Sequence, residues 1–295
     1  MSVRVEIISI NEAEQLIGSF SDPVYAKEFF AFKEKSYHFK GGFLKIFKNS
    51  VFFALIPINY SAKEMYSVYK DYAEPFFVSV DREIDWQEVI LVAREFKSLR
   101  YCEFNFVFFD NCTVVQSLKK TLLSVFLLKI DPQSSWLEVC RLFNSKMRNV
   151  RKAEKQGFVI RITGLKEIKE IYALYKENME RHGTPSKSFS FFLDLFSVFK
   201  DKCLAVAAYD KDVLVGVNIV LIHNKSLRLL FQVSKSDYWS RRINDFLYYY
   251  MIKLAHEKGL SAVDYGPSLN SDETHNRFKL SFGAVQLPIF KVTSG

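Results

Sequence analysis

Apolar residues gather in three successive stretches of the second half of the chain. The stretches 203–210, 213–223 and 227–233 are rich in Val, Leu and Ile, and the turn residues 210–212 and 224–225 separate them. Short apolar runs bounded by such turns are typical of antiparallel strands. The pattern therefore predicts a three-stranded meander.

A helix and a further strand are predicted directly after this meander. Gly259 is a helix stop, and residues 262–265 (AVDY) have the composition of a short strand. A strand, a helix and another strand in this order favour parallel pairing of the two strands. The apolar helical stripe before Gly259 consists of Ile243, Leu247, Tyr250, Met251 and Leu254.

The first half of the chain has a similar order of elements. Strands are predicted at 43–47, 51–60 and 76–80, a helix at 84–99, and a strand at 101–109. The same unit thus occurs twice, which indicates an internal repeat. Pro132 marks the boundary between the halves.

Helical sequence precedes the meander of the second half. It covers residues 134–157, 165–183 and 188–199, with a strand at 158–163 between the first two segments. Gly157 and Gly183 are predicted to end two of these helices.

Composition restricts the class of protein. With 295 residues, 49% hydrophobic and 25% charged, the chain is typical of a globular protein. No apolar stretch reaches the roughly 18 residues that a membrane-spanning helix needs. The N-terminal residues do not have the pattern of a signal peptide, so we expect a cytoplasmic location.

Cysteines and the usual catalytic motifs narrow the chemistry further. Cys102, Cys112, Cys140 and Cys203 have neither CxxC spacing nor a nearby histidine, so we expect reduced core residues and no metal site. The sequence contains no G-x-S-x-G, Walker, H-E-x-x-H or dinucleotide motif. This absence argues against a hydrolase, an NTPase or a zinc enzyme.

Positive charge is concentrated in the second half. Residues 1–120 carry 15 Lys and Arg against 16 Asp and Glu, whereas residues 121–295 carry 26 against 17. Such a concentration attracts polyanions, although cations at helical spacing are also typical of a solvated helix face. Six cations fall within residues 141–155, namely Arg141, Lys146, Arg148, Arg151, Lys152 and Lys155.

The order of elements resembles the tandem GNAT arrangement of the FemAB peptidoglycan aminoacyltransferases and the related BioF2-like acyltransferases. Four strings support the resemblance: KMRNVRKAEKQGFVIRI (146–162), NMERHGTPSKSFSFF (178–192), AAYDKDVLVGVNIVL (207–221) and VDYGPSLNSDETHNRFKLSFGAVQLPI (263–289). They lie in the family's order. In residues 1–125 the resemblance extends only to the overall layout.

The resemblance implies an α/β fold with mixed sheets and two tandem GNAT-like domains, 1–125 and 126–295. It also implies transfer of an acyl or aminoacyl group to an amine of a cell-wall precursor such as that of peptidoglycan, an amino sugar or a polysaccharide unit. No resident cofactor and no DNA partner are expected. Peripheral contact with a membrane is left open.

The acyl donor is expected to be aminoacyl-tRNA or acyl-CoA. Acetyl-CoA enzymes of the GNAT class have a glycine-containing turn before the long helix, because backbone N–H groups there approach a pyrophosphate. The corresponding stretch 238–246 (YWSRRINDF) has no glycine, as in the Fem enzymes. The alternatives are an acyl-CoA enzyme with an altered pyrophosphate site and a non-catalytic protein that binds an anionic ligand.

Lys279 is the first catalytic candidate. It follows Phe278 where the family has a Phe-Lys pair, which implies a lysine near the reacting end of the donor and Phe278 in the substrate site. A lysine there would stabilise developing negative charge. We expect an exposed side chain, so Lys279→Met should slow turnover about 100-fold and leave folding nearly unchanged.

Further candidates follow from position. Asp264 and Tyr265 end the last predicted strand, where a proton acceptor can act, although Asp264 can also simply cap the loop. The remaining candidates are substrate-binding residues: Arg148, Arg151 and Lys152 for phosphates, and Arg181, Tyr238 and Asn244 for the acceptor groove. His182 is an alternative general base or a partner of the helix dipole.

Overall fold

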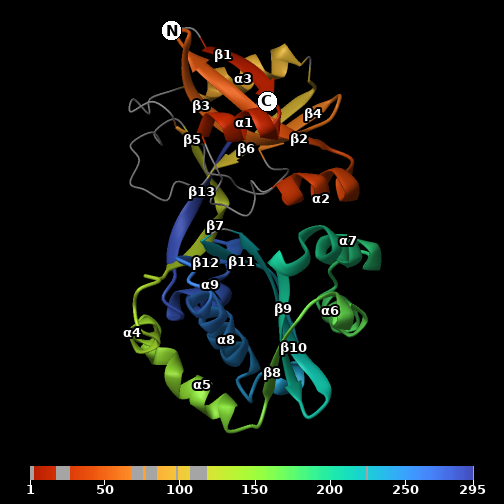
Figure 1. Ribbon diagram of the computed structural model, residues 1–295, viewed down its shortest axis with the longest axis vertical. Helices are drawn as coiled ribbons and strands as arrows, with labels where there is room; N and C mark the ends of the chain where they lie inside the picture. Colours follow the sequence, from red (N-terminus) through yellow and green to blue (C-terminus); the bar gives the residue numbers. More distant parts are fainter. Residues whose placement is uncertain are drawn as a thin grey trace.

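Two lobes are stacked along the long axis of the molecule, and both chain ends lie in the same lobe (Figure 1). The computed structural model describes residues 3–17, 27–67, 76–77, 85–97, 99–106, 118–223 and 225–294. The strands form one mixed 13-stranded sheet that continues from one lobe to the other. The mixed α/β fold expected from the sequence is confirmed.

The upper lobe is built from the first part of the chain. Its core lies between the sheet and α3, whose side chains Trp86, Val89 and Ile90 are fully buried. Asp85 begins this helix by accepting a hydrogen bond from the Gln87 N–H. The elements are β1 (Val3–Ile8), α1 (Ile10–Ile17), α2 (Lys27–Tyr37), β2 (Lys40–Lys48), β3 (Val51–Tyr60), β4 (Glu64–Ser67), β5 (Phe76–Phe77), α3 (Trp86–Phe96) and β6 (Tyr101–Phe106).

The third strand of this lobe differs from the prediction. β3 turns tightly into β4, because the Ser61 side chain accepts hydrogen bonds from the N–H groups of Lys63 and Glu64. β4 then pairs in parallel with β6. Of the predicted strand 76–80, β5 pairs with β3, and the rest lies outside the described residues, as do Cys112 and Asn224.

The lower lobe contains the predicted meander of β9, β10 and β11, followed by α8 and then β12. β11 and β12 pair in parallel, as expected. Gly157, Gly183 and Gly259 follow helix ends and have positive φ. The elements are α4 (Trp136–Arg141), α5 (Met147–Glu154), β8 (Val159–Thr163), α6 (Ile168–Arg181), α7 (Phe189–Phe199), β9 (Cys203–Asp210), β10 (Val213–His223), β11 (Ser226–Ser234), α8 (Ile243–Glu257), β12 (Ala262–Leu269) and α9 (Glu273–Ser281).

Helices cover both faces of the lower sheet. α8 and α5 lie on one face, and α6 and α7 lie on the other. The core on the α6 and α7 face continues into the upper lobe, where Phe32 of α2 packs against Phe191 and Phe199 of α7. The two lobes therefore share a hydrophobic contact in addition to the sheet.

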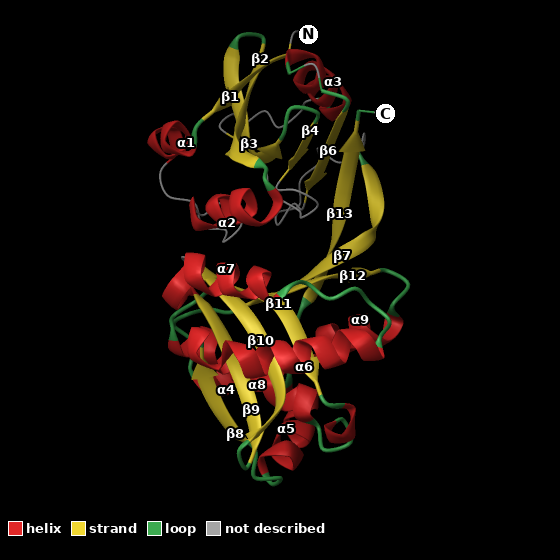
Figure 2. Ribbon diagram, turned by 90° about the vertical axis from the view of Figure 1, so that its right-hand side faces the viewer, coloured by secondary structure: helices red, strands yellow, loops and turns green. Residues whose placement is uncertain are grey.

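Two strands join the lobes, and the sequence did not predict either of them. β7 (Lys119–Lys129) pairs with β12, and β13 (Val285–Thr293) pairs with both β7 and β6. The C-terminal strand thus returns to the first lobe (Figure 2). Because the expected boundary between residues 125 and 126 falls inside β7, the division into two domains stays a prediction.

Candidate functional site

The strands β11 and β12 diverge near the centre of the lower lobe. They pair at only three positions, Ser226 with Ala262, Leu227 with Val263 and Arg228 with Asp264. Beyond Arg228, residues 229–234 of β11 have no partner in β12. This divergence of the two strands, which we call the opening, leaves the edge of residues 229–234 that faces β12 without a partner strand, and a ligand can pair with such an edge.

A β-bulge bends β12 away from β11. Asp264 lies opposite Leu127 of β7, but the next pair is Pro267 with Val125, so two residues of β12 face one residue of β7. Gly266 in this bulge has φ +73°, and a Cβ there would lie 3.4 Å from the Leu229 carbonyl oxygen. The positive φ of the bulge is therefore what favours glycine at this position.

Lys279 of α9 holds this bulge. Its ammonium donates hydrogen bonds to Gly266 O at 2.9 Å, Pro267 O at 3.3 Å and Ser268 Oγ at 3.2 Å. The residue is only 8% exposed, and burial lowers its pKa to about 8. The expectation of an exposed lysine was wrong, because the bent strand directs its carbonyls into the protein, where this ammonium satisfies them.

Asp264 and Tyr265 differ in their surroundings although they are neighbours. Asp264 accepts a hydrogen bond from the Gly266 N–H and lies 3.4 Å from Arg228 Nε, with both side chains largely buried. The Tyr265 hydroxyl donates to the Phe282 carbonyl in the core, and burial raises the pKa of Tyr265 well above its usual value. Tyr265 therefore has the contacts of a core residue, whereas Asp264 anchors the opening.

Ser234, at the end of β11, gathers two of the predicted acceptor-groove residues. Its hydroxyl donates to Asn244 Oδ1 at 2.8 Å, and its carbonyl lies 3.4 Å from the guanidinium nitrogens of Arg181. Trp239 donates its indole N–H to the same hydroxyl, and the Arg181 guanidinium lies over its ring. Arg181 and Asn244 are thus brought together at the open end of β11.

The loop between β11 and α8 is closed by its own hydrogen bonds. The N–H groups of Tyr238, Trp239, Arg241 and Arg242 donate to carbonyls within the loop. Arg242 begins α8 with a left-handed φ of +68°, a conformation usually reserved for glycine. These N–H groups are therefore not directed at a pyrophosphate as an open glycine turn would be.

Tyr238 and His182 lie near this loop without joining the Ser234 cluster directly. Tyr238 packs against Phe158, and the Arg241 guanidinium lies over its ring. Arg241 also pairs with Asp210 at 2.6 Å, and this contact lowers the pKa of Asp210. His182 is exposed beside Arg181 at the end of α6.

The predicted phosphate-binding cations lie on α5 at the outside of the lobe. Arg148 and Arg151 are exposed, whereas Lys152 Nζ reaches Ser240 O of the loop at 3.5 Å. Lys146 instead forms an ion pair with the buried Asp245 of α8 at 3.1 Å and lies over the ring of Phe278. Phe278 packs against Tyr248 in the core, and its place in the substrate site stays a prediction.

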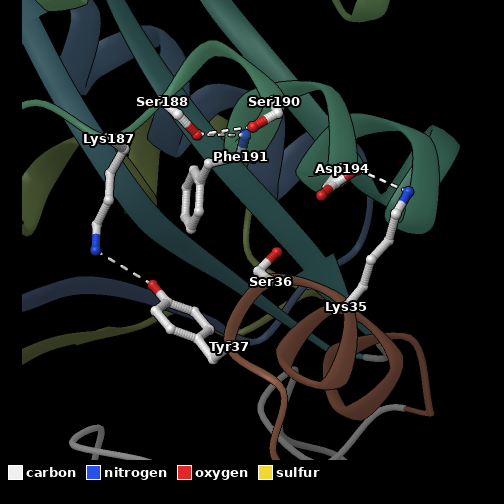
Figure 3. A pocket seen from close by; sticks show the side chains of 8 residues that line it. All are labelled: Lys35, Ser36, Tyr37, Lys187, Ser188, Ser190, Phe191 and Asp194. Atoms are coloured by element: carbon white, nitrogen blue, oxygen red, sulfur yellow. Dashed lines mark hydrogen bonds and ion pairs between the residues drawn. The ribbon is translucent and has the colours of Figure 1, made fainter.

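A pocket of about 260 Å³ lies between α2 and α7, where the two lobes meet (Figure 3). From α2 it is lined by Lys35, Ser36 and Tyr37. From the other lobe it is lined by Lys187, Ser188, Ser190, Phe191 and Asp194. Residues about 150 positions apart in the sequence thus form one site.

The pocket combines positive charge with hydroxyl groups. Lys187 Nζ donates to the Tyr37 hydroxyl at 3.3 Å, and Lys35 pairs with Asp194 at 2.7 Å. Ser188 begins α7 by accepting a hydrogen bond from the Phe191 N–H, so the positive end of the helix dipole faces the pocket. The buried Ser36 hydroxyl has no hydrogen-bond partner among the described residues.

The pocket adjoins the open segment of β11. Phe191, which lines the pocket, lies 6.2 Å from the ring of Phe231, and Phe231 belongs to the part of β11 that has left β12. One layer of aromatic rings therefore separates the pocket from the diverging strands.

Sequence reasoning missed Arg228, Lys35 and Tyr37. Lys187 and the two serines lie in the string 178–192, which was noted only for its resemblance. Lys35 and Tyr37 lie in an ordinary charged helix, and only the contact between the lobes gives them a role.

Residues 142–280 match a family model described as "Acetyltransferase (GNAT) domain". No curated protein matches the sequence significantly. This part of the chain is thus similar to GNAT acetyltransferase domains.

Solved structures of the same fold cover almost the whole chain. FemX has a TM-score of 0.67 at 11% identity, over 98% of this chain and 96% of FemX. The C-terminal domain of a putative lysylphosphatidylglycerol synthetase from Agrobacterium fabrum has a TM-score of 0.62 at 11% identity, over 97% of this chain and 91% of that domain. A tandem GNAT protein from the clavulanic acid biosynthesis pathway has a TM-score of 0.56 at 8% identity, over 100% of this chain and 99% of that protein.

These identities show a shared fold rather than a shared substrate. The predicted tandem GNAT fold and the resemblance to FemAB-like acyltransferases are confirmed at this level.

Proposed function

We propose that this protein transfers an acyl or aminoacyl group to an amine whose molecule also carries an anionic group such as a phosphate. The observation that carries the proposal is the divergence of β11 and β12 beside a pocket with two lysines. A cell-wall precursor or a phosphorylated amino sugar has the required amine and anion. The location expected from the sequence, the cytoplasm, is where such precursors and both donors would be available.

The pocket is proposed as the acceptor's anchor. Lys187 supplies positive charge, whereas the charge of Lys35 is paired with Asp194. The hydroxyls of Ser36, Tyr37 and Ser190 supply hydrogen bonds to phosphate oxygens. The N-terminus of α7 adds the positive end of the helix dipole to this positive charge. An acceptor held there would direct its amine past Phe191 towards the open segment of β11.

The edge of β11 is proposed as the place of the donor's carbonyl. Backbone N–H groups that β12 has released can donate to the oxygen on which charge develops during transfer. The amine attacks the carbonyl carbon, the donor's ester or thioester oxygen or sulfur leaves, and the amine proton passes to a base or to water. Asp264 is the carboxylate closest to this opening along β12.

Aminoacyl-tRNA is the donor that the loop before α8 favours. Four of its N–H groups, those of Tyr238, Trp239, Arg241 and Arg242, are engaged within the loop, and it lacks the glycine of the usual acyl-CoA pyrophosphate turn. The exposed cations of α5 beside this loop can bind phosphates of an RNA backbone. Acyl-CoA remains the second candidate because it is the typical donor of the GNAT class.

Two measurements test the proposal. Purified protein is titrated with coenzyme A by calorimetry and with charged tRNA by gel shift, and each donor is then offered with a phosphorylated amine acceptor. We expect amide product from charged tRNA and not from acetyl-CoA. Product from acyl-CoA alone would reassign the donor, and binding without product from either donor would leave only a binding protein.

A further inference from the structure

The outer face of α4 and α5 combines exposed leucines with exposed cations. Leu137 is 68% exposed and Leu142 is 49% exposed, although large apolar side chains are normally covered. Both helices lie at the outside of the lower lobe, away from α6 and α7 (Figure 1). The exposed cations of this face, which we call the α4–α5 face, are Arg141, Arg148, Arg151, Lys152 and Lys155.

Most of this charge is not neutralised within the protein. No hydrogen bond or ion pair joins the side chains of Arg148, Arg151 or Lys155 to another residue in the described part of the chain. The acidic residues nearby are Glu138, which is held by the N–H and hydroxyl of Ser135, and Glu154. The face therefore has a clear excess of positive charge.

The α4–α5 face is supported from beneath. Trp136 donates its indole N–H to the Tyr249 hydroxyl of α8, and Lys146 and Asn149 both contact Asp245 of the same helix. Val139, Val150 and Ala153 are buried on the inner side. Leucines and cations are thus presented on a fixed surface, and presenting them costs little ordering of the chain.

We propose that the α4–α5 face is a docking surface for an anionic lipid bilayer. Cations attract the negatively charged headgroups, and leucines among them can enter the boundary between headgroups and acyl chains. A nucleic acid would use the cations but would gain nothing from Leu137 and Leu142, and the bases would find no exposed aromatic ring among residues 136–155 beyond the half-buried Trp136. The combination therefore favours a bilayer.

Co-sedimentation with vesicles tests the docking surface. We expect the protein to bind vesicles that contain phosphatidylglycerol and not vesicles of phosphatidylcholine alone. Leu137→Ser with Leu142→Ser should weaken binding about tenfold because apolar contact is lost. Arg141→Gln with Arg148→Gln should weaken it about 30-fold, since each cation near such a surface contributes about 1 kcal/mol.

A matched control is available on the opposite side of the lobe. Leu165, which is also 49% exposed, lies beside the exposed Lys166 and Lys169. Leu165→Ser with Lys166→Gln and Lys169→Gln should leave vesicle binding within about twofold of the wild type. Thermal unfolding of each variant separates lost docking from misfolding.

Three outcomes would overturn the proposal. They are no binding to phosphatidylglycerol vesicles, an equal loss in the control variant, and binding that the leucine substitutions leave unchanged. If the leucine substitutions have no effect and tRNA competes the protein off the vesicles, the face is a nucleic-acid surface instead. That last outcome would assign these cations to the tRNA donor of the proposed function. The other outcomes leave amide formation untouched, so failure of the docking surface and failure of the proposed function are distinguishable.

Discussion

The opening between β11 and β12 and the pocket between the lobes both contain lysines, but these lysines have opposite surroundings. At the opening, Lys279 is buried and donates to three oxygens of β12. In the pocket, Lys187 is exposed and reaches one tyrosine hydroxyl. A lysine that donates all its hydrogen bonds within the protein fixes the shape of the site. A lysine with donors left over is available to a ligand.

The same contrast applies to two arginine–aspartate pairs, one at the centre of the sheet and one at its edge. Arg228 and Asp264 are 7% and 14% exposed, whereas Arg161 and Asp212 are 51% and 95% exposed. Removing one partner of a buried pair leaves the other charge uncompensated. The central pair should therefore matter far more to folding.

The largest predicted effect is that of Arg228→Met. We expect a loss of about 3 kcal/mol in the free energy of unfolding, because Asp264 would stay buried without this cation. Arg161→Met is the control and should cost less than about 1 kcal/mol. Urea denaturation of both variants measures the difference, and equal losses would show that the opening does not depend on this pair.

Lys279→Met should have the next largest effect. Gly266 O and Pro267 O would lose their donor inside the protein, which we expect to cost about 2 kcal/mol. Lys155→Met, at an exposed position of the same residue type, should change stability by less than about 0.5 kcal/mol. A normal midpoint in urea for Lys279→Met would contradict the role of this lysine in holding the bulge.

The pH dependence of Lys279 sharpens this prediction. Burial lowers its pKa to about 8, below the value of an unfolded lysine near 10.4. Between these values the unfolded state binds more protons, so the contribution of Lys279 to stability should rise with pH. The stability difference between wild type and Lys279→Met should therefore widen from about pH 8 to about pH 10, and a difference that narrows would contradict the assignment.

Lys187→Met should act on binding rather than on folding. We expect KM for a phosphorylated amine acceptor to rise about tenfold, because one charge-assisted contact is lost, while kcat stays within about twofold. Lys169→Met on α6 is the control, with an unchanged KM. Steady-state kinetics decides the point, and a lower kcat at constant KM would move Lys187 away from the acceptor.

Tyr265→Phe should have the smallest effect. The substitution removes the hydrogen bond to the Phe282 carbonyl in the core and should cost about 1 kcal/mol. Turnover should be nearly unchanged, since the hydroxyl points into the core. A large loss of turnover with little loss of stability would restore the catalytic role predicted from the sequence.

Local patterns in the sequence were sufficient for most of the elements that pack within the lower lobe. Apolar runs separated by turn residues predicted the meander from β9 to β11, and the apolar stripe with its glycine stop predicted α8. β7 and β13 were missed because their pairing joins residues that are far apart in the chain. No local pattern specifies such a register.

The candidate site was predictable only in part, for the same reason. The stretch around Asp264 and Lys279 was recognised, but the burial of Lys279 depends on a bulge that only the fold creates. The structure brings Arg181 and Asn244 together at Ser234, and their role in an acceptor groove stays a prediction. The pocket could not be predicted, because α2 and α7 meet only when the lobes are packed together.

The most direct test compares Lys187→Met with Lys279→Met in one experiment that records both thermal unfolding and transfer to a phosphorylated amine. The account predicts that Lys187→Met unfolds like the wild type and has a raised KM, whereas Lys279→Met unfolds at a clearly lower temperature. The reverse result would contradict the account. If Lys279→Met were normally folded and lost turnover while Lys187→Met behaved like the wild type, Lys279 would be the catalytic cation and the pocket would not hold the acceptor.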